Sequence, residues 1–185
     1  LILLGTFFLT IIFDLTVAVQ VGLILACIFF IYRISSLTRI EKLELPESFA
    51  HEDDLPLNDS FDLKNSVEAY GIYGSLFFGA VDKVEDLFNP QDPTRLKPKV
   101  IILEMHQLIN IDTSGIDALK ALNKSLNKHG GQLLVCCANS QPSSLMVRSG
   151  FIDEIGPENS LETLDLAFER AKKLSAEACK VNVGS

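Results

Sequence analysis

The feature that most limits what this chain can fold into is its first 32 residues, which hold 25 apolar residues and a single charge, Asp14. One helix of that length would measure about 48 Å at a rise of about 1.5 Å per residue. The hydrocarbon core of a membrane is only about 30 Å thick. We therefore expect residues 1–32 to form two short transmembrane helices split near Asp14, the second over residues 15–32.

Asp14 itself allows two interpretations. As a turn residue and helix N-cap, its carboxylate would accept hydrogen bonds from the first turn of the second helix, where negative charge is also favoured. Alternatively, it is a buried carboxylate on an ion path, because ionisable groups inside membranes are usually functional. The turn and cap is the preferred interpretation, and Asp14 is assigned to no site.

The segment after the apolar run predicts an orientation. Arg33, Arg39 and Lys42 follow it closely, and an excess of Lys and Arg beyond a span marks the cytoplasmic side of a membrane. Residues 41–62 also hold eight acidic residues and two prolines, which is typical of an extended, solvated linker. We expect residues 33–62 to be a cytosolic acidic linker.

Charge and cysteine content restrict the function of the remainder. After residue 32 the chain carries 16 Lys and Arg against 23 Asp and Glu, and this acidity argues against nucleic acid as a partner. The four cysteines form no C-x-x-C pattern, which favours a reduced, cytosolic compartment. The chain begins at Leu1 inside the apolar run, without a basic segment before it. We therefore predict the C-terminal piece of a longer membrane protein rather than a signal peptide.

The soluble part alternates strand and helix patterns. The continuous apolar run at 100–103 is typical of a strand buried on both faces, and residues 132–138 predict a second buried strand. Residues 116–129 have the spacing of an amphipathic helix. Alternation of this kind predicts an α/β domain with a mostly parallel sheet and flanking helices. The remaining expected elements are one or two strands over 67–76, a turn at 110–115, and helices over 80–87, 142–149 and 161–176, the last capped by Ser160.

Residues 112–115, with the sequence Asp-Thr-Ser-Gly, form the most informative local pattern. They lie between a buried strand and a long helix, so Asp112, Thr113 and Ser114 can accept hydrogen bonds from the first helical turn. One interpretation is simple helix capping. The other is a regulatory site, with a phosphoryl group on Ser114 or a bound anion at the helix N-terminus before Gly115.

The order of these segments resembles a known family. Residues 108–115 and 145–151, with the helix, glycine pair and buried strand between them, are similar to a STAS domain, the fold shared by sulfate transporters and anti-sigma-factor antagonists. Residues 71–80 resemble the opening of that domain in transporters, and residues 13–22 resemble the last two membrane helices of the SulP anion permeases. The resemblance covers residues 1–176. It implies a division into a membrane segment 1–32, a linker 33–62, a STAS domain 63–176 and a flexible tail 177–185.

The resemblance implies a secondary active transporter or exchanger for sulfate, bicarbonate or dicarboxylates. Such a protein is multi-pass in the inner cell membrane, in contact with lipid, and usually a homodimer. Its STAS domain lies in the cytoplasm as a regulatory and interaction module, and in one type of bacterial relative it holds acyl carrier protein. The substrate site of the family lies earlier in the chain, so no substrate-binding residue is assigned here.

The resemblance also supplies an alternative. In anti-sigma-factor antagonists, a kinase phosphorylates the serine directly before the motif glycine, and that serine is Ser114 here. The chain would then be a membrane-tethered STAS signalling domain switched by phosphorylation. Nucleotide binding at the helix end over residues 112–115 is a third hypothesis, although no glycine-rich loop or basic cluster accompanies it.

The residues give little support for an enzyme. His51, His106 and His129 are scattered, without the spacing of metal ligands, and His106 is expected to be an edge histidine after a buried strand. Cys136 and Cys137 are adjacent in an expected strand, so their side chains should point to opposite faces. We expect no catalytic residue, no metal site and no cofactor.

Overall fold

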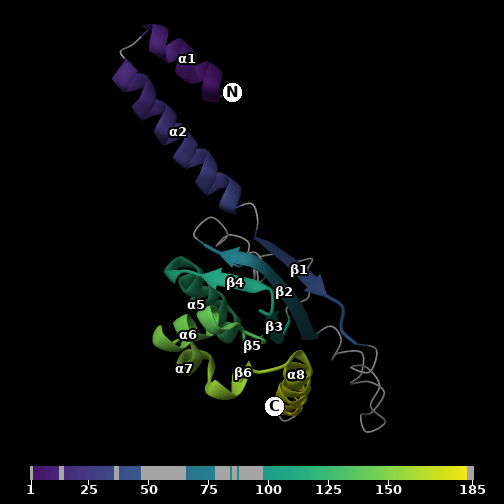
Figure 1. The fold of residues 1–185 in the computed structure, drawn as a ribbon. Helices are drawn as coiled ribbons and strands as arrows, with labels where there is room; N and C mark the ends of the chain where they lie inside the picture. The colour runs from purple at the N-terminus through teal and green to yellow at the C-terminus, as the bar shows by residue number, and fades with distance from the viewer. Residues whose placement is uncertain are drawn as a thin grey trace. The chain divides into compact units, whose positions relative to one another are not determined.

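The computed structural model describes residues 2–12, 15–35, 38–46, 66–77, 84, 87 and 98–182, which are coloured in Figure 1. Most of the helix expected over residues 80–87 lies outside the described residues. The contacts divide the chain into two compact units, Leu1–Leu37 and Thr38–Ser185, here called the helical unit and the sheet unit. Each is described by itself.

The helical unit consists of α1 (Ile2–Ile12) and α2 (Leu15–Ser35), which contact each other as a hairpin (Figure 1). The break between them falls at residues 13–14, outside the described residues. Ala18 and Gly22 are buried on one face of α2. In the described ranges, no helix is both long enough and apolar enough to cross a membrane. Many large apolar side chains of both helices are exposed, among them Leu3, Phe7, Phe8, Leu23, Ile24, Phe30 and Ile31.

Six strands of the described residues form one mixed sheet in the sheet unit (Figure 1). β1 is antiparallel to β2, and the other pairings are parallel. The predicted α/β fold with a mostly parallel sheet and flanking helices is confirmed. The strands in spatial order are β1 (Arg39–Leu43), β2 (Val67–Leu76), β3 (Val100–Glu104), β5 (Gln132–Cys136) and β6 (Ser160–Leu161), while β4 (Leu108–Ile111) pairs with the end of β2.

The central strands are apolar on both faces because helices cover both. In β3, Ile101 and Leu103 belong to a core cluster with residues of α5 (Thr113–Lys128). Ile102, between them, belongs to a second cluster with residues of α8 (Leu164–Asn182). Successive side chains of a strand alternate between faces, so a strand with two covered faces needs an unbroken apolar run.

The position of β1 corrects the expected linker. The linker prediction for residues 33–62 is wrong at Arg39–Leu43, which pairs in register with β2. Lys42 Nζ lies 2.6 Å from Glu68 Oε1 across the two strands, and Ile40 packs against the core cluster that includes α5. Charged side chains are common on edge strands because one side of the strand stays in water. The acidic composition of residues 33–62 therefore gives no indication of the strand that they contain.

The turn expected at residues 110–115 is also corrected. Its first two residues belong to β4, and its last three belong to α5, which begins at Thr113. Asn110 and Ile111 pair with the end of β2, and a parallel pairing between distant segments leaves no local sequence signal. Asp112 is thus the whole connection between strand and helix.

The last third of the sheet unit holds more elements than expected. α6 (Ser140–Arg148) and α7 (Phe151–Ile155) are followed by a short 3-10 helix, Pro157–Asn159. The expected N-cap Ser160 lies instead in β6, where it pairs with β5.

The boundaries of α8 differ from the expected helix at both ends. The start is set by Thr163, because its Oγ1 accepts a hydrogen bond from the backbone N–H of Leu166 at 3.3 Å. The other end runs as helix to Asn182. The expected flexible tail over residues 177–185 is therefore helical for most of its length.

Candidate regulatory site at the start of helix α5

Asp112 caps α5. Its Oδ1 accepts a hydrogen bond from the backbone N–H of Gly115 at 2.8 Å, and its own backbone is extended, with φ −106° and ψ −177°. The backbone N–H of Asp112 donates to the carbonyl of Leu76 at 3.3 Å, which fixes the helix start to the end of β2. The carboxylate also places negative charge at the positive end of the helix dipole. Its geometry is that of a structural cap.

Removing this cap has a measurable expected cost. Asp112→Ala should lower the free energy of unfolding of the sheet unit by about 1 kcal/mol, because one N–H of the first helical turn loses its acceptor. Asp112→Asn keeps an acceptor oxygen, so it should lower the free energy of unfolding by only a few tenths of the loss expected for Asp112→Ala. Urea unfolding followed by circular dichroism measures both variants. Equal losses in the two variants would contradict the capping role.

Close packing, rather than a ligand, explains why residue 115 is glycine. A Cβ atom at this position would lie 2.7 Å from Ile111 Cγ1 and 2.7 Å from the carbonyl oxygen of Leu76. Both distances are far below van der Waals contact, and the second atom belongs to the backbone of β2. Glycine is therefore the residue that allows α5 to begin this close to the sheet.

Thr113 and Ser114 are the accessible members of the predicted site. Thr113 is exposed and Ser114 half-buried in the first turn of α5. Thr113 also lines a shallow pocket of about 290 Å³ between α5 and α6, together with Ile116, Leu145, Arg148 and Ser149. Of the four predicted residues, Asp112 and Gly115 thus hold the structure, Thr113 is exposed, and Ser114 is half-buried, as Asp112 is.

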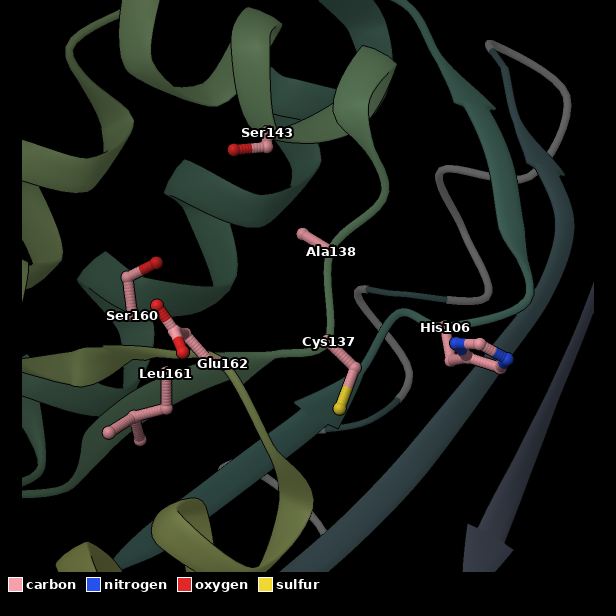
Figure 2. Close-up of a pocket in the computed structure, with 7 residues that line it drawn as sticks. All are labelled: His106, Cys137, Ala138, Ser143, Ser160, Leu161 and Glu162. Carbon is pink, nitrogen blue, oxygen red and sulfur yellow. The ribbon is translucent and has the colours of Figure 1, made fainter.

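A second pocket, of about 460 Å³, opens at the carboxyl ends of β3 and β5 (Figure 2). His106 and Cys137, which local sequence patterns do not connect, line this one cavity. Parallel strands gather the loops after their carboxyl ends at one edge, and this rule is the signal that could have found it. The lining residues are His106, Cys137, Ala138, Ser143, Ser160, Leu161 and Glu162.

The loop that carries His106 is held by hydrogen bonds that its backbone makes. The N–H of His106 donates to Glu104 Oε1 at 2.9 Å, and Asn139 Nδ2 donates to the carbonyl of His106 at 2.8 Å. The backbone N–H of Met105 reaches the carbonyl of Cys136 at 2.9 Å. Within the described ranges, no group of three His, Cys, Asp or Glu residues is arranged to hold a metal ion.

The two adjacent cysteines correct a second expectation. β5 ends at Cys136, and Cys137 has φ 58°, a left-handed conformation that is rare for residues other than glycine. The prediction that they point to opposite faces is therefore wrong. Cys136 lies in the core cluster with α8 and Cys137 packs against the same cluster. Burial raises the pKa of the Cys136 thiol well above its ordinary value, and the neighbouring Cys137 thiol adds to the shift.

Comparison with known proteins gives consistent matches. The model of the STAS domain family matches residues 61–165. A Bacillus subtilis protein named as a sulfate transporter, YvdB, is 35% identical over 164 residues, which cover 89% of this chain and 29% of that protein. The crystal structure of a sulfate transporter family protein from Wolinella succinogenes is 32% identical, with a TM-score of 0.53, and covers 65% of this chain and 89% of its own.

A larger solved structure shares the fold. The mouse solute carrier 26 family member A9, an anion transporter in the inward-facing state, matches 93% of this chain and 28% of its own with a TM-score of 0.65 at 15% identity. This chain spans less than a third of the length of the curated relatives that it matches. The residues matched by the family model, 61–165, include β2 to β6 and both pockets described above.

Proposed function

Since the chain belongs to the STAS-domain family, we propose that it is the C-terminal part of a SulP-type secondary active anion transporter, with the sheet unit as its cytosolic regulatory module. The observation that carries the proposal is the match to YvdB, which extends over 89% of the chain and so beyond the STAS domain itself. Sulfate, bicarbonate and dicarboxylates are the anions proposed. The module would bind and regulate rather than catalyse.

The exposed apolar side chains of the helical unit support the proposal that the protein is a multi-pass membrane protein. Its exposed side chains are mainly apolar, with Leu3 80% and Phe30 63% exposed. Exposed apolar surface of this kind marks a site covered by lipid or by other protein. Arg33 follows near the end of α2, and positive residues beyond a span favour the cytoplasmic side. We propose lipid contact for α1 and α2 and a cytoplasmic place for the sheet unit.

Two further partners belong to the same proposal. A second copy of the transporter would form a homodimer, and a cytosolic regulator would bind the STAS domain, for which acyl carrier protein is one candidate. The family resemblance supports both.

Anion uptake tests the proposed activity. Cells that lack their own sulfate uptake, and that express the complete coding sequence, should accumulate labelled sulfate, bicarbonate or a dicarboxylate above the empty-vector level. Excess of the unlabelled transported anion should suppress the signal. Uptake equal to the empty vector for all three anions would contradict the proposal.

A second candidate function is a phosphorylation switch at Ser114. The observation that favours it is the half-buried position of Ser114 in the first turn of α5, beside exposed Thr113. A phosphoryl group there would be stabilised by the positive end of the helix dipole. It would add negative charge beside the Asp112 carboxylate and so change the surface that a partner meets.

The switch predicts a difference between variants. Ser114→Asp, which adds a negative charge, should change anion uptake or the affinity for a cytosolic partner by several-fold, while membrane insertion stays the same. Ser114→Ala, which removes the acceptor hydroxyl, should fix the protein in its unphosphorylated behaviour. Uptake measured in cells and normalised to the inserted protein is the readout. Equal uptake by wild type and both variants would exclude the switch.

A further inference from the structure

We propose that Cys136 and Cys137 form an oxidisable pair of neighbouring thiols, a modification site that a hydroperoxide converts to a disulfide between adjacent residues. The proposal is independent of transport and of the switch at Ser114. It rests on the conformation of Cys137, on the core cluster that both side chains share, and on the pocket that exposes one of them.

The left-handed turn at Cys137 places both cysteine side chains against one core cluster. In a continuing strand the side chains would diverge, but φ 58° at Cys137 turns its side chain back toward the end of β5. Both side chains pack against the same core cluster. The two side chains therefore meet the same core cluster before any oxidation.

The two thiols differ in access. Cys136 is 1% exposed, whereas Cys137 is half-buried and lines the pocket of about 460 Å³. Figure 2 shows the Cys137 side chain among the residues of that pocket. A small oxidant reaches Cys137 first. Cys136 needs only to reach the adjacent Cys137, whose side chain packs against the same core cluster.

The chemistry proceeds in two balanced steps. The Cys137 thiolate attacks the peroxide oxygen, so that the O–O bond breaks, Cys137 becomes a sulfenic acid and hydroxide leaves. The Cys136 sulfur, giving up its proton, then attacks the Cys137 sulfur, the S–O bond breaks and water leaves with the hydroxyl group. The thiol pair loses two electrons and two protons, and the peroxide is reduced to water and hydroxide.

The resulting disulfide should be easy to reduce. Adjacent Cα atoms are about 3.8 Å apart across a trans peptide bond, whereas disulfides usually join Cα atoms at least about 4.4 Å apart. A strained disulfide is more oxidising and is typical of labile, regulatory bonds. The backbone N–H of Cys137 donates to the carbonyl of Leu161 at 3.1 Å, so closure of the ring would alter the link between β5 and β6 at the wall of the pocket.

Mass spectrometry of the full chain tests the proposal. The protein is treated with hydrogen peroxide, denatured in N-ethylmaleimide and digested with trypsin. The peptide over residues 129–148 contains Cys136 and Cys137 and no other cysteine. It should carry no maleimide and should weigh two hydrogens less than the reduced peptide. Reduced glutathione, added before denaturation, should restore two maleimide groups.

Variants separate the steps. Cys136→Ala leaves Cys137 without a partner, so its sulfenic acid should accumulate and react with dimedone. Cys137→Ser should leave Cys136 reduced, because Cys136 is buried. A background of Cys27→Ser and Cys179→Ser should still form the disulfide. Phenylarsine oxide, which joins two neighbouring thiols with loss of water and needs no oxidant, should bind the untreated wild type at this peptide.

Two outcomes would overturn the proposal. One is a peptide with two maleimide groups after peroxide treatment, together with no binding of phenylarsine oxide. The other is a disulfide that joins Cys136 or Cys137 to Cys27 or Cys179 instead.

Discussion

Replacing Phe151 by alanine is expected to lower the free energy of unfolding of the sheet unit by about 3–5 kcal/mol. Phe151 begins α7, is fully buried, and belongs to the core cluster that includes α5. Its removal loses the burial of an aromatic ring and leaves a cavity that the surrounding sheet and helices can only partly close. Urea unfolding of a fragment that starts at Thr38 measures the loss, because the contacts separate that unit from the helical unit.

The neighbouring residue is the matched control for Phe151. Ile152 is half-buried and packs only at the edge of the same cluster. Ile152→Ala removes less buried surface, so its loss of stability should be clearly smaller than that of Phe151→Ala. Equal losses in the two variants would contradict the place of Phe151 in the core.

Replacing Gly115 by valine is expected to destabilise the sheet unit by about 3 kcal/mol, at the upper end of the usual cost of overpacking. The first added carbon atom would already lie 2.7 Å from the carbonyl oxygen of Leu76. That atom belongs to the end of β2, where Leu76 pairs with Ile111 of β4, so it cannot easily move. Either α5 shifts away from the sheet or the end of β2 distorts. Urea unfolding reports the loss, and a shift of α5 should also weaken the Asp112 cap.

Ser114 supplies the control for Gly115. It is the preceding residue in the same helical turn and is half-buried. Ser114→Ala should change the free energy of unfolding by about 0.5 kcal/mol or less. A Gly115→Val variant as stable as Ser114→Ala would show that α5 does not pack against β2 as described.

The parts of the fold that sequence patterns predicted are those determined by local periodicity and burial. The run at 100–103 is apolar because both faces of β3 are covered, and α5 shows its buried face through Ile116, Leu119 and Leu126 at helical spacing. Asp112 was predictable as a cap because it lies directly before such a helix. In each case the pattern lies within a few neighbouring residues.

The parts that sequence patterns missed depend on distant partners. β1 is recognisable only from its pairing with β2, and β6 only from its pairing with β5. Cys137 was misplaced because alternation holds only while a strand continues, and β5 stops one residue earlier.

The residues of the candidate site are predictable from local sequence, but their packing against distant residues is not. Residues 112–115 were identified from capping chemistry, but the steric role of Gly115 depends on Leu76, which is distant in sequence. The pocket of His106 and Cys137 draws its residues from the ends of several strands. Only the folded sheet brings those residues together.

We propose that the sheet unit regulates an anion transporter of which it is part. This proposal is tested most directly by labelled sulfate uptake per molecule of membrane-inserted protein, in cells that express the complete coding sequence with and without residues 38–182. We expect uptake above the empty vector for the intact protein and a several-fold change when the sheet unit is absent. Identical uptake per inserted molecule with and without residues 38–182 would contradict it.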